Sequence, residues 1–99
     1  MIIYMFDLKE DYYVISKHAT ERFILPSDKF YNATKKHEDF VCPEDISMLG
    51  KEIELIKAGK KKFHDMKYRW LDKHNNPVWI NCRGSVLFDE NTQPHYLVG

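Results

Sequence analysis

Hydrophobic and polar residues alternate in the second half of the chain. Met66, Tyr68 and Trp70 are separated by charged residues. A period of two predicts a strand with one buried face. The stretch from Val78 to Phe88 has the same period, with Val78, Ile80, Cys82, Gly84, Val86 and Phe88 on the expected inner face. A turn of type His-Asn-Asn-Pro at residues 74–77 separates the two stretches and predicts a hairpin.

The middle of the chain has helical periodicity instead. Pro43 suits a first helical position, and Gly59 suits a helix stop, so we expect one longer helix over residues 43–58. Its apolar stripe would face the sheet. That stripe consists of Ile46, Leu49, Ile53 and Ile56.

The remaining segments predict short elements. Residues 1–8 and 12–15 read as strands, residues 17–24 as a short helix, and residues 95–99 as a last strand. Residues 27–40 read as a long loop with one or two single-turn helices. Strands at both ends and helices between them predict an α+β fold, with an antiparallel sheet and helices over one face.

Length and charge limit the classes of function. A chain of 99 residues supports one hydrophobic core, so residues 1–99 form a single domain. Fifteen basic residues balance fifteen acidic ones, which gives no overall field that would attract nucleic acid or an anionic membrane. No apolar run is long enough to span a bilayer, and the N-terminus lacks signal-peptide features. Two cysteines forty positions apart predict reduced thiols, so we expect a cytoplasmic protein.

The sequence contains no motif of a known catalytic class. It has no Gly-x-Ser-x-Gly elbow, phosphate-binding loop or His-Glu-x-x-His pair. Five histidines are present, but His37 and Cys42 lie five positions apart across a proline, and the other candidates are scattered. We therefore expect no catalytic residues and no metal site.

Several short motifs occur in an order that resembles the PAS domains of the bacterial sensory-box type. The likeness covers essentially the whole chain. Its residues are Leu25-Pro26-Ser27, Pro43-Glu44-Asp45, Tyr68-Arg69, Trp79, Arg83-Gly84, Asp89-Glu90-Asn91, Pro94 and Leu97-Val98-Gly99. Two turns depart from the usual pattern, because Asn75-Asn76 stands in place of Asp-Gly and Thr92 in place of Gly.

The resemblance implies a five-stranded antiparallel sheet with helices that enclose a small cavity. It also implies a sensory module that acts on a downstream output domain in the same parent chain. Similar PAS regions precede GGDEF diguanylate cyclase and histidine kinase domains, and a diguanylate cyclase in cyclic-di-GMP signalling is the expected parent. Relatives continue past Gly99 into an Asp-x-Thr segment, so we expect the last strand to be truncated here.

Two cofactors of related domains deserve comparison with this sequence. Asn81-Cys82-Arg83 is similar to part of the flavin-adduct motif, but here the cysteine lies in a predicted strand and is followed by Gly-Ser-Val. Haem-binding relatives place a histidine on the long helix, whereas His37 precedes that helix and His64 follows it. We expect neither flavin nor haem, and the cofactor stays unidentified.

A ligand cavity is expected between the long helix and the sheet. Gly84 removes a side chain in mid-strand, and His64 and Tyr68 offer polar contacts. The candidate ligand-binding residues are Ile53, Ile56, His64, Met66, Tyr68, Ile80, Cys82 and Gly84. A filled core without a ligand explains the same pattern equally well, and the sequence leaves the two open.

Trp79 and Leu87 fall on the opposite, outer face of the sheet. Large apolar groups on an exposed face suggest a partner, and the resemblance implies a homodimer. A flanking segment of the parent chain would cover them equally well. Three classes therefore stay open: a small-molecule sensor, a ligand-free dimerising transducer, and a small enzyme with an α+β cavity. The first is the preferred interpretation.

Overall fold

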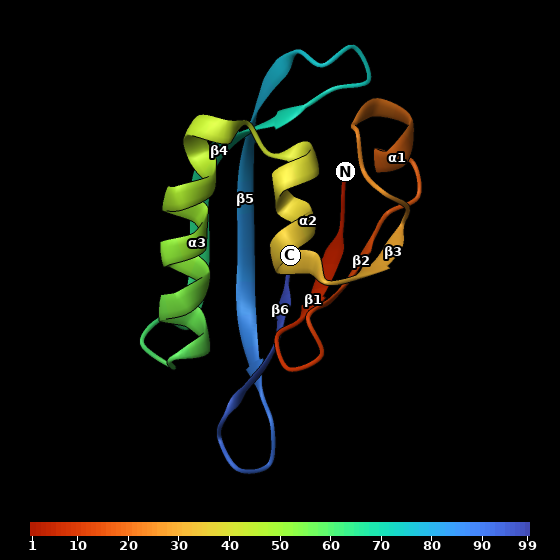
Figure 1. Cartoon of the computed structure of the whole chain (residues 1–99). Coiled ribbons are helices and arrows are strands. Elements are labelled where there is room, and N and C mark those ends of the chain that lie inside the picture. The colour runs from red at the N-terminus through yellow and green to blue at the C-terminus, as the bar shows by residue number, and fades with distance from the viewer.

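A computed structural model describes all residues from 1 to 99. Six strands form one antiparallel sheet in the order β3-β2-β1-β6-β5-β4. Three helices lie on one side of this sheet (Figure 1). The elements, in chain order, are β1 (Tyr4–Asp7), β2 (Tyr12–Ile15), α1 (Ala19–Arg22), β3 (Lys29–Tyr31), α2 (Ala33–Phe40), α3 (Pro43–Lys57), β4 (Phe63–Leu71), β5 (Pro77–Phe88) and β6 (Pro94–Val98).

The α+β architecture is confirmed, and the count of strands is corrected from five to six. The additional strand is β3, which pairs with β2 at the edge of the sheet. This strand has only three residues, with Phe30 buried between two exposed neighbours. Such a short pattern of alternation cannot be distinguished from a loop in the sequence. The adjacent helix α2 is also longer than the single turns that we expected, because it runs for eight residues.

The hydrophobic core lies between the inner face of the sheet and the helices. The inner positions of β4 and β5 are more buried than their outer neighbours, as the period of two predicts. Helix α3 buries Leu49, Ile53 and Ile56 against the sheet, and Ile46 packs beside them. The helical stripe predicted from the sequence is therefore confirmed.

The first half of β5 has a strand neighbour on one side only. Strand β4 pairs with β5 from Pro77 to Ser85. Strand β6 pairs only with Ser85–Phe88 and with β1. The segment from Val78 to Cys82 therefore leaves a gap between β5 and the N-terminal end of β1. No helix in the structure combines the length and the apolar character that crossing a bilayer requires.

Candidate ligand cavity

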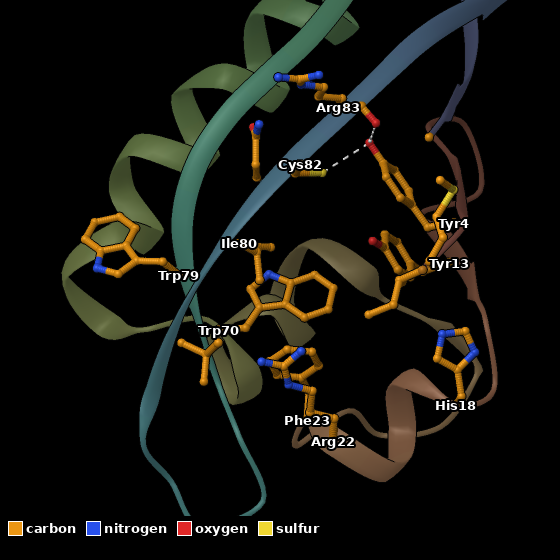
Figure 2. A pocket seen from close by; sticks show the side chains of 15 residues that line it. Tyr4, Tyr13, His18, Arg22, Phe23, Trp70, Trp79, Ile80, Cys82 and Arg83 are labelled. Carbon is orange, nitrogen blue, oxygen red and sulfur yellow. Dashed lines mark hydrogen bonds between the residues drawn. The ribbon is translucent and has the colours of Figure 1, made fainter.

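A cavity of about 650 Å³ opens on the inner side of the sheet, beside the unpaired half of β5. Figure 2 shows side chains from β1, β2, α1, β4 and β5 around it. Ten of its fifteen lining residues are hydrophobic, which is the usual character of a small-molecule site. The lining residues are Met1, Ile2, Tyr4, Tyr13, His18, Arg22, Phe23, Trp70, Val78, Trp79, Ile80, Asn81, Cys82, Arg83 and Gly99.

The alternation in β5 explains why this part of the core stays open. Val78, Ile80 and Cys82 point to the inner face, but they are only half-buried, whereas Val86 further along the strand is buried. Val86 pairs with Leu97 on β6. Because β6 does not extend beside Val78 to Cys82, their inner sides border the cavity instead of another side chain.

Tyr4 connects the two sides of the cavity. Its hydroxyl accepts a hydrogen bond from the Cys82 thiol at 3.2 Å and donates one to the Arg83 carbonyl at 3.3 Å (Figure 2). Burial raises the pKa of Tyr4 and of Cys82 above their ordinary values. Both groups are therefore neutral at physiological pH, and the thiol is a poor nucleophile. These groups are suited to binding a ligand, not to covalent chemistry.

Trp70 contributes a polar group without a partner. Its side chain is 3% exposed, and Nε1 forms no hydrogen bond. Tyr68 is the nearest polar neighbour, with ring centroids 6.5 Å apart. Its interaction with Trp70 partly opposes the burial that raises the pKa of Tyr68, but the two groups do not meet the geometry of a hydrogen bond. Phe23 and Phe40 hold the indole by edge contacts with ring centroids 5.2 and 5.1 Å away. Trp70 lines the cavity, and its buried, unpaired donor would gain a hydrogen bond from a ligand that reaches it.

The cavity has basic side chains around it and no acidic ones among its lining residues. His18 and Arg22 approach from the region of α1, and Arg83 from β5, and no aspartate or glutamate is among the lining residues. Arg83 lies 3.6 Å from Asp65 on the outer face of the sheet. Arg22 forms no ion pair, and its guanidinium lies 5.1 Å from the centre of the Phe23 ring. The cavity is therefore locally basic in a chain of zero net charge.

The structure places the predicted ligand residues in three groups. Ile80 and Cys82 line the cavity. Ile53, Ile56 and Tyr68 are buried in the core, and Met66 packs against that core. His64 and Gly84 are paired in the β4–β5 register and border a second, shallower hollow of about 420 Å³. The eight residues therefore do not converge on one site, and their role in ligand binding stays a prediction.

His64 and Glu52 form a polar cluster that the sequence did not indicate. Nδ1 of His64 lies 3.0 Å from Glu52, which also accepts from Lys61 at 2.7 Å. Both His64 and Glu52 are buried. This contact connects α3, which carries Glu52, to β4, which carries His64. The other histidine considered as a haem ligand, His37, lies in the core among Phe6, Tyr13 and Phe40.

The cavity also contains residues that sequence reasoning missed. Tyr4, Tyr13 and Phe23 come from the first quarter of the chain, where short elements gave no indication of which face each side chain takes. Arg22 falls at the end of a single helical turn. Of the missed residues, Trp70 and Val78 were detectable, because they continue the inward alternation of β4 and β5.

Trp79 and Leu87 lie on the outer face, as their parity predicts. Their exposed fractions are 67% and 51%. The Trp79 indole also stacks against Arg69, whose guanidinium lies 5.0 Å from the ring centre. In Figure 2 Trp79 projects away from the other cavity side chains, although it borders the opening. The assignment of these residues to a dimer interface stays a prediction.

Comparison with solved structures gives the same fold. The chain is similar to a sensory box histidine kinase/response regulator from Burkholderia thailandensis, with a TM-score of 0.74 and 17% identity over 99% of this chain and 72% of that one. It is also similar to the N-terminal domain of a diguanylate cyclase with PAS/PAC sensor from Marinobacter aquaeolei, with a TM-score of 0.78 and 19% identity over 99% of this chain and 89% of that one.

Comparison of sequences identifies the family. No curated protein sequence matches the chain. The family model described as the PAS fold matches residues 14–99. This match includes α1 to α3, the β4–β5 hairpin and most of the cavity residues. The chain therefore belongs to the PAS fold family.

Proposed function

We propose that this PAS domain is a cytoplasmic sensor module that binds a small molecule and passes a conformational signal to an output domain in its parent chain. The domain itself carries out no catalysis. The two structural neighbours are parts of signalling proteins, a histidine kinase and a diguanylate cyclase. A diguanylate cyclase in cyclic-di-GMP signalling is the parent that we favour.

The observation that supports binding is the partly apolar cavity beside β5. Its volume of about 650 Å³ lies within the range of small-molecule sites. Inward-facing Val78, Ile80 and Cys82 retain exposed surface there, whereas Tyr68, Trp70 and Val86 on the same face are buried. A ligand would cover this apolar surface, and that burial would supply its affinity.

A route for the signal runs from the cavity to the end of β6. The Tyr4 hydroxyl contacts Cys82 in the cavity, while the Tyr4 backbone exchanges two hydrogen bonds with Gly99, of 2.8 and 3.1 Å. A ligand that displaces the Tyr4 ring would therefore act on the strand pair β1–β6. We propose that this shift is passed on by β6, by changing the populations of two packings of strand and helix.

Native mass spectrometry of the protein as purified from cells tests the binding role. We expect an additional mass that is present under native conditions and absent after denaturation. A cavity-filling variant, Cys82→Leu, should lose that mass while remaining folded. A clean polypeptide mass for the wild type, at every protein concentration and from several hosts, would contradict the proposal.

A second candidate function is a ligand-free module that dimerises through the outer face of the sheet. The supporting observation is the exposure of Trp79 and Leu87 on that face. Large apolar groups in such positions are typical of protein–protein contacts. In this alternative the output domain responds to the arrangement of two copies of the domain.

Sedimentation velocity distinguishes the second candidate. The dimer model predicts a homodimer that Trp79→Ala or Leu87→Ala converts to monomer. Lys67→Ala is a matched control, because Lys67 is an exposed, polar residue of β4 on the same outer face of the sheet. A wild-type monomer at high concentration, or a dimer that both variants leave unchanged, would contradict this role.

A further inference from the structure

The geometry points to a specific class of ligand: a planar aromatic molecule that carries a carboxylate at one end and a neutral hydrogen-bond acceptor at the other. This inference rests on the proposed binding function. The carboxylate would be held by Arg22, with His18 beside it, at the α1 side of the cavity. The neutral acceptor would accept from Nε1 of Trp70 in the interior.

The charges around the cavity favour an anion. His18, Arg22 and Arg83 are among the lining residues, and acidic side chains are not. Arg83 is engaged with Asp65. Backbone hydrogen bonds and, to a lesser degree, the Arg22 charge lower the pKa of the neighbouring Asp72, but Arg22 has no acidic partner within ion-pair distance. A guanidinium binds a carboxylate through two parallel hydrogen bonds, so Arg22 has a full complement of donors to offer. A ligand cation would meet repulsion at the same place.

The interior favours a neutral acceptor. Nε1 of Trp70 is buried and has no partner, and an indole N–H can only donate. An unpaired buried donor is destabilising, and a ligand acceptor would remove that penalty. The Tyr4 and Cys82 groups nearby already bond to each other. The Trp70 donor is therefore the interior group that most directly selects a ligand.

The lining favours a planar aromatic body. Tyr4 and Tyr13 stack with parallel rings, at 5.7 Å between centroids and 5° between planes. Phe23 and Trp70 present rings from the opposite side of the cavity (Figure 2). Aromatic side chains contact other aromatic rings through offset stacks and edges, which a flat ligand satisfies and a branched aliphatic one does not.

Calorimetric titration with three related probes tests this class. The first probe is 6-hydroxy-2-naphthoate, which has both groups. The second, 6-hydroxy-2-naphthamide, lacks the charge, and the third, 2-naphthoate, lacks the inner acceptor. We expect the first probe to bind about ten-fold more tightly than the amide and about five-fold more tightly than 2-naphthoate.

Two variants assign these preferences to residues. Arg22→Gln should remove the preference for carboxylate over amide, while the preference for the hydroxyl remains. Trp70→Phe should remove the preference for the hydroxyl and leave that for the carboxylate. Arg22 is an exposed residue, so its variant will fold. It therefore tests the preference for a carboxylate even if Trp70→Phe does not fold. Lys67→Gln, on the outer face, is the control that should alter neither preference.

The outcomes separate this inference from the proposed function. Equal binding of the carboxylate and the amide, or a carboxylate preference that survives Arg22→Gln, would overturn the ligand class while leaving a small-molecule site. Failure of all three probes to bind would also overturn the class. The native mass spectrum decides the binding function independently, and a neutral aliphatic molecule found there would support the function and overturn this inference.

Discussion

The Tyr4 hydroxyl occupies the position that a side chain on Gly84 would need. A Cβ at Gly84 would lie 2.6 Å from that oxygen, 3.0 Å from a methyl of Leu97 and 3.1 Å from the Val98 carbonyl. Contacts below 3.0 Å are not tolerated, and the Tyr4 oxygen is held by Cys82 and by the Arg83 backbone. The absence of a side chain at Gly84 thus allows Tyr4 to bridge β1 and β5.

Gly84→Ala is therefore expected to destabilise the domain by about 2 kcal/mol, as overpacking in a core does. Gly50→Ala is a matched control, because a Cβ there meets nothing within 4 Å. Gly50 lies inside helix α3, where alanine is favoured over glycine by about 1 kcal/mol. Chemical denaturation should therefore give opposite signs for the two changes. A neutral Gly84→Ala would show that Tyr4 moves without cost.

Thr92 adopts a backbone conformation that is unfavourable for a β-branched residue. Its φ of 58° lies in the left-handed region, in the turn between β5 and β6. Thr92→Gly should raise the free energy of unfolding by about 1 kcal/mol, after the greater flexibility of glycine in the unfolded chain is included. Asn75, with a φ of 66°, tolerates the same region, so Asn75→Gly should change stability much less. Thermal denaturation of both variants measures the difference, and equal effects would contradict the explanation.

His37 is expected to make stability depend on pH between 6.5 and 4. Burial lowers the pKa of His37 from 6.5 to about 4, although the Ala33 backbone and the charge of Asp11 partly oppose this effect. Between these values the unfolded chain binds the proton more readily, so the free energy of unfolding falls as the pH falls. A difference of this size corresponds to roughly 3 kcal/mol over the window.

Replacing the imidazole tests this dependence. His37→Leu should keep most of its stability at pH 7, because leucine is also apolar and can pack among Phe6, Tyr13 and Phe40. It should also flatten the decline between pH 6.5 and 4 in urea denaturation. The exposed His74 provides a control, and His74→Gln should retain the wild-type decline. A His37→Leu profile parallel to the wild type would refute this assignment.

Asp45 fixes the start of α3 to the edge of the sheet. Its carboxylate accepts from the Arg69 backbone at 2.9 Å and from the Arg69 guanidinium at 2.8 and 2.9 Å. These hydrogen bonds, led by those of the side chain, lower the pKa of Asp45 below its usual 3.8. The stabilisation is complete above this ordinary value and is lost as the pH falls through the lower, folded-state pKa.

Asp45→Asn should cost about 2 kcal/mol at pH 7, because hydrogen bonds to a charged group are lost. The variant should also lose part of the wild-type decline in stability at acid pH. Glu44→Gln is the neighbouring control: Glu44 is 69% exposed and 3.8 Å from Arg69, so its removal should have little effect. Similar stability of Asp45→Asn and the wild type in urea would contradict this account.

The sequence predicted the parts of the fold whose patterns are long. Nine residues of β4 and twelve of β5 alternate clearly, and α3 repeats its apolar stripe over about three turns. By contrast, β3 has three residues and α1 has four, which is less than two periods of either pattern. Their type depends on tertiary contacts, such as the pairing of Phe30 with Tyr13, which local sequence does not encode.

The cavity was harder to predict for the same reason. Parity identified Ile80 and Cys82, which lie on the long strand β5. Tyr68 was selected by the same alternation and Ile56 by the helical stripe, because such patterns indicate the buried face without indicating where packing is incomplete. The cavity lies where β6 no longer pairs with β5, and that depends on the register of distant strands. Which charged groups lie near Arg22 likewise depends on the fold and cannot be read from the local sequence.

The most direct test of the binding site uses the two tryptophans of the chain as reporters. Trp70 lies in the cavity with a free Nε1, and Trp79 lies on the outer face with 67% of its surface exposed. Nitrogen–proton NMR spectra should contain one indole signal for each, which Trp79→Phe assigns. Titration with 6-hydroxy-2-naphthoate should shift the Trp70 signal and leave that of Trp79 nearly unchanged. A bound probe that shifts only Trp79, or neither signal, would place binding elsewhere and contradict the account.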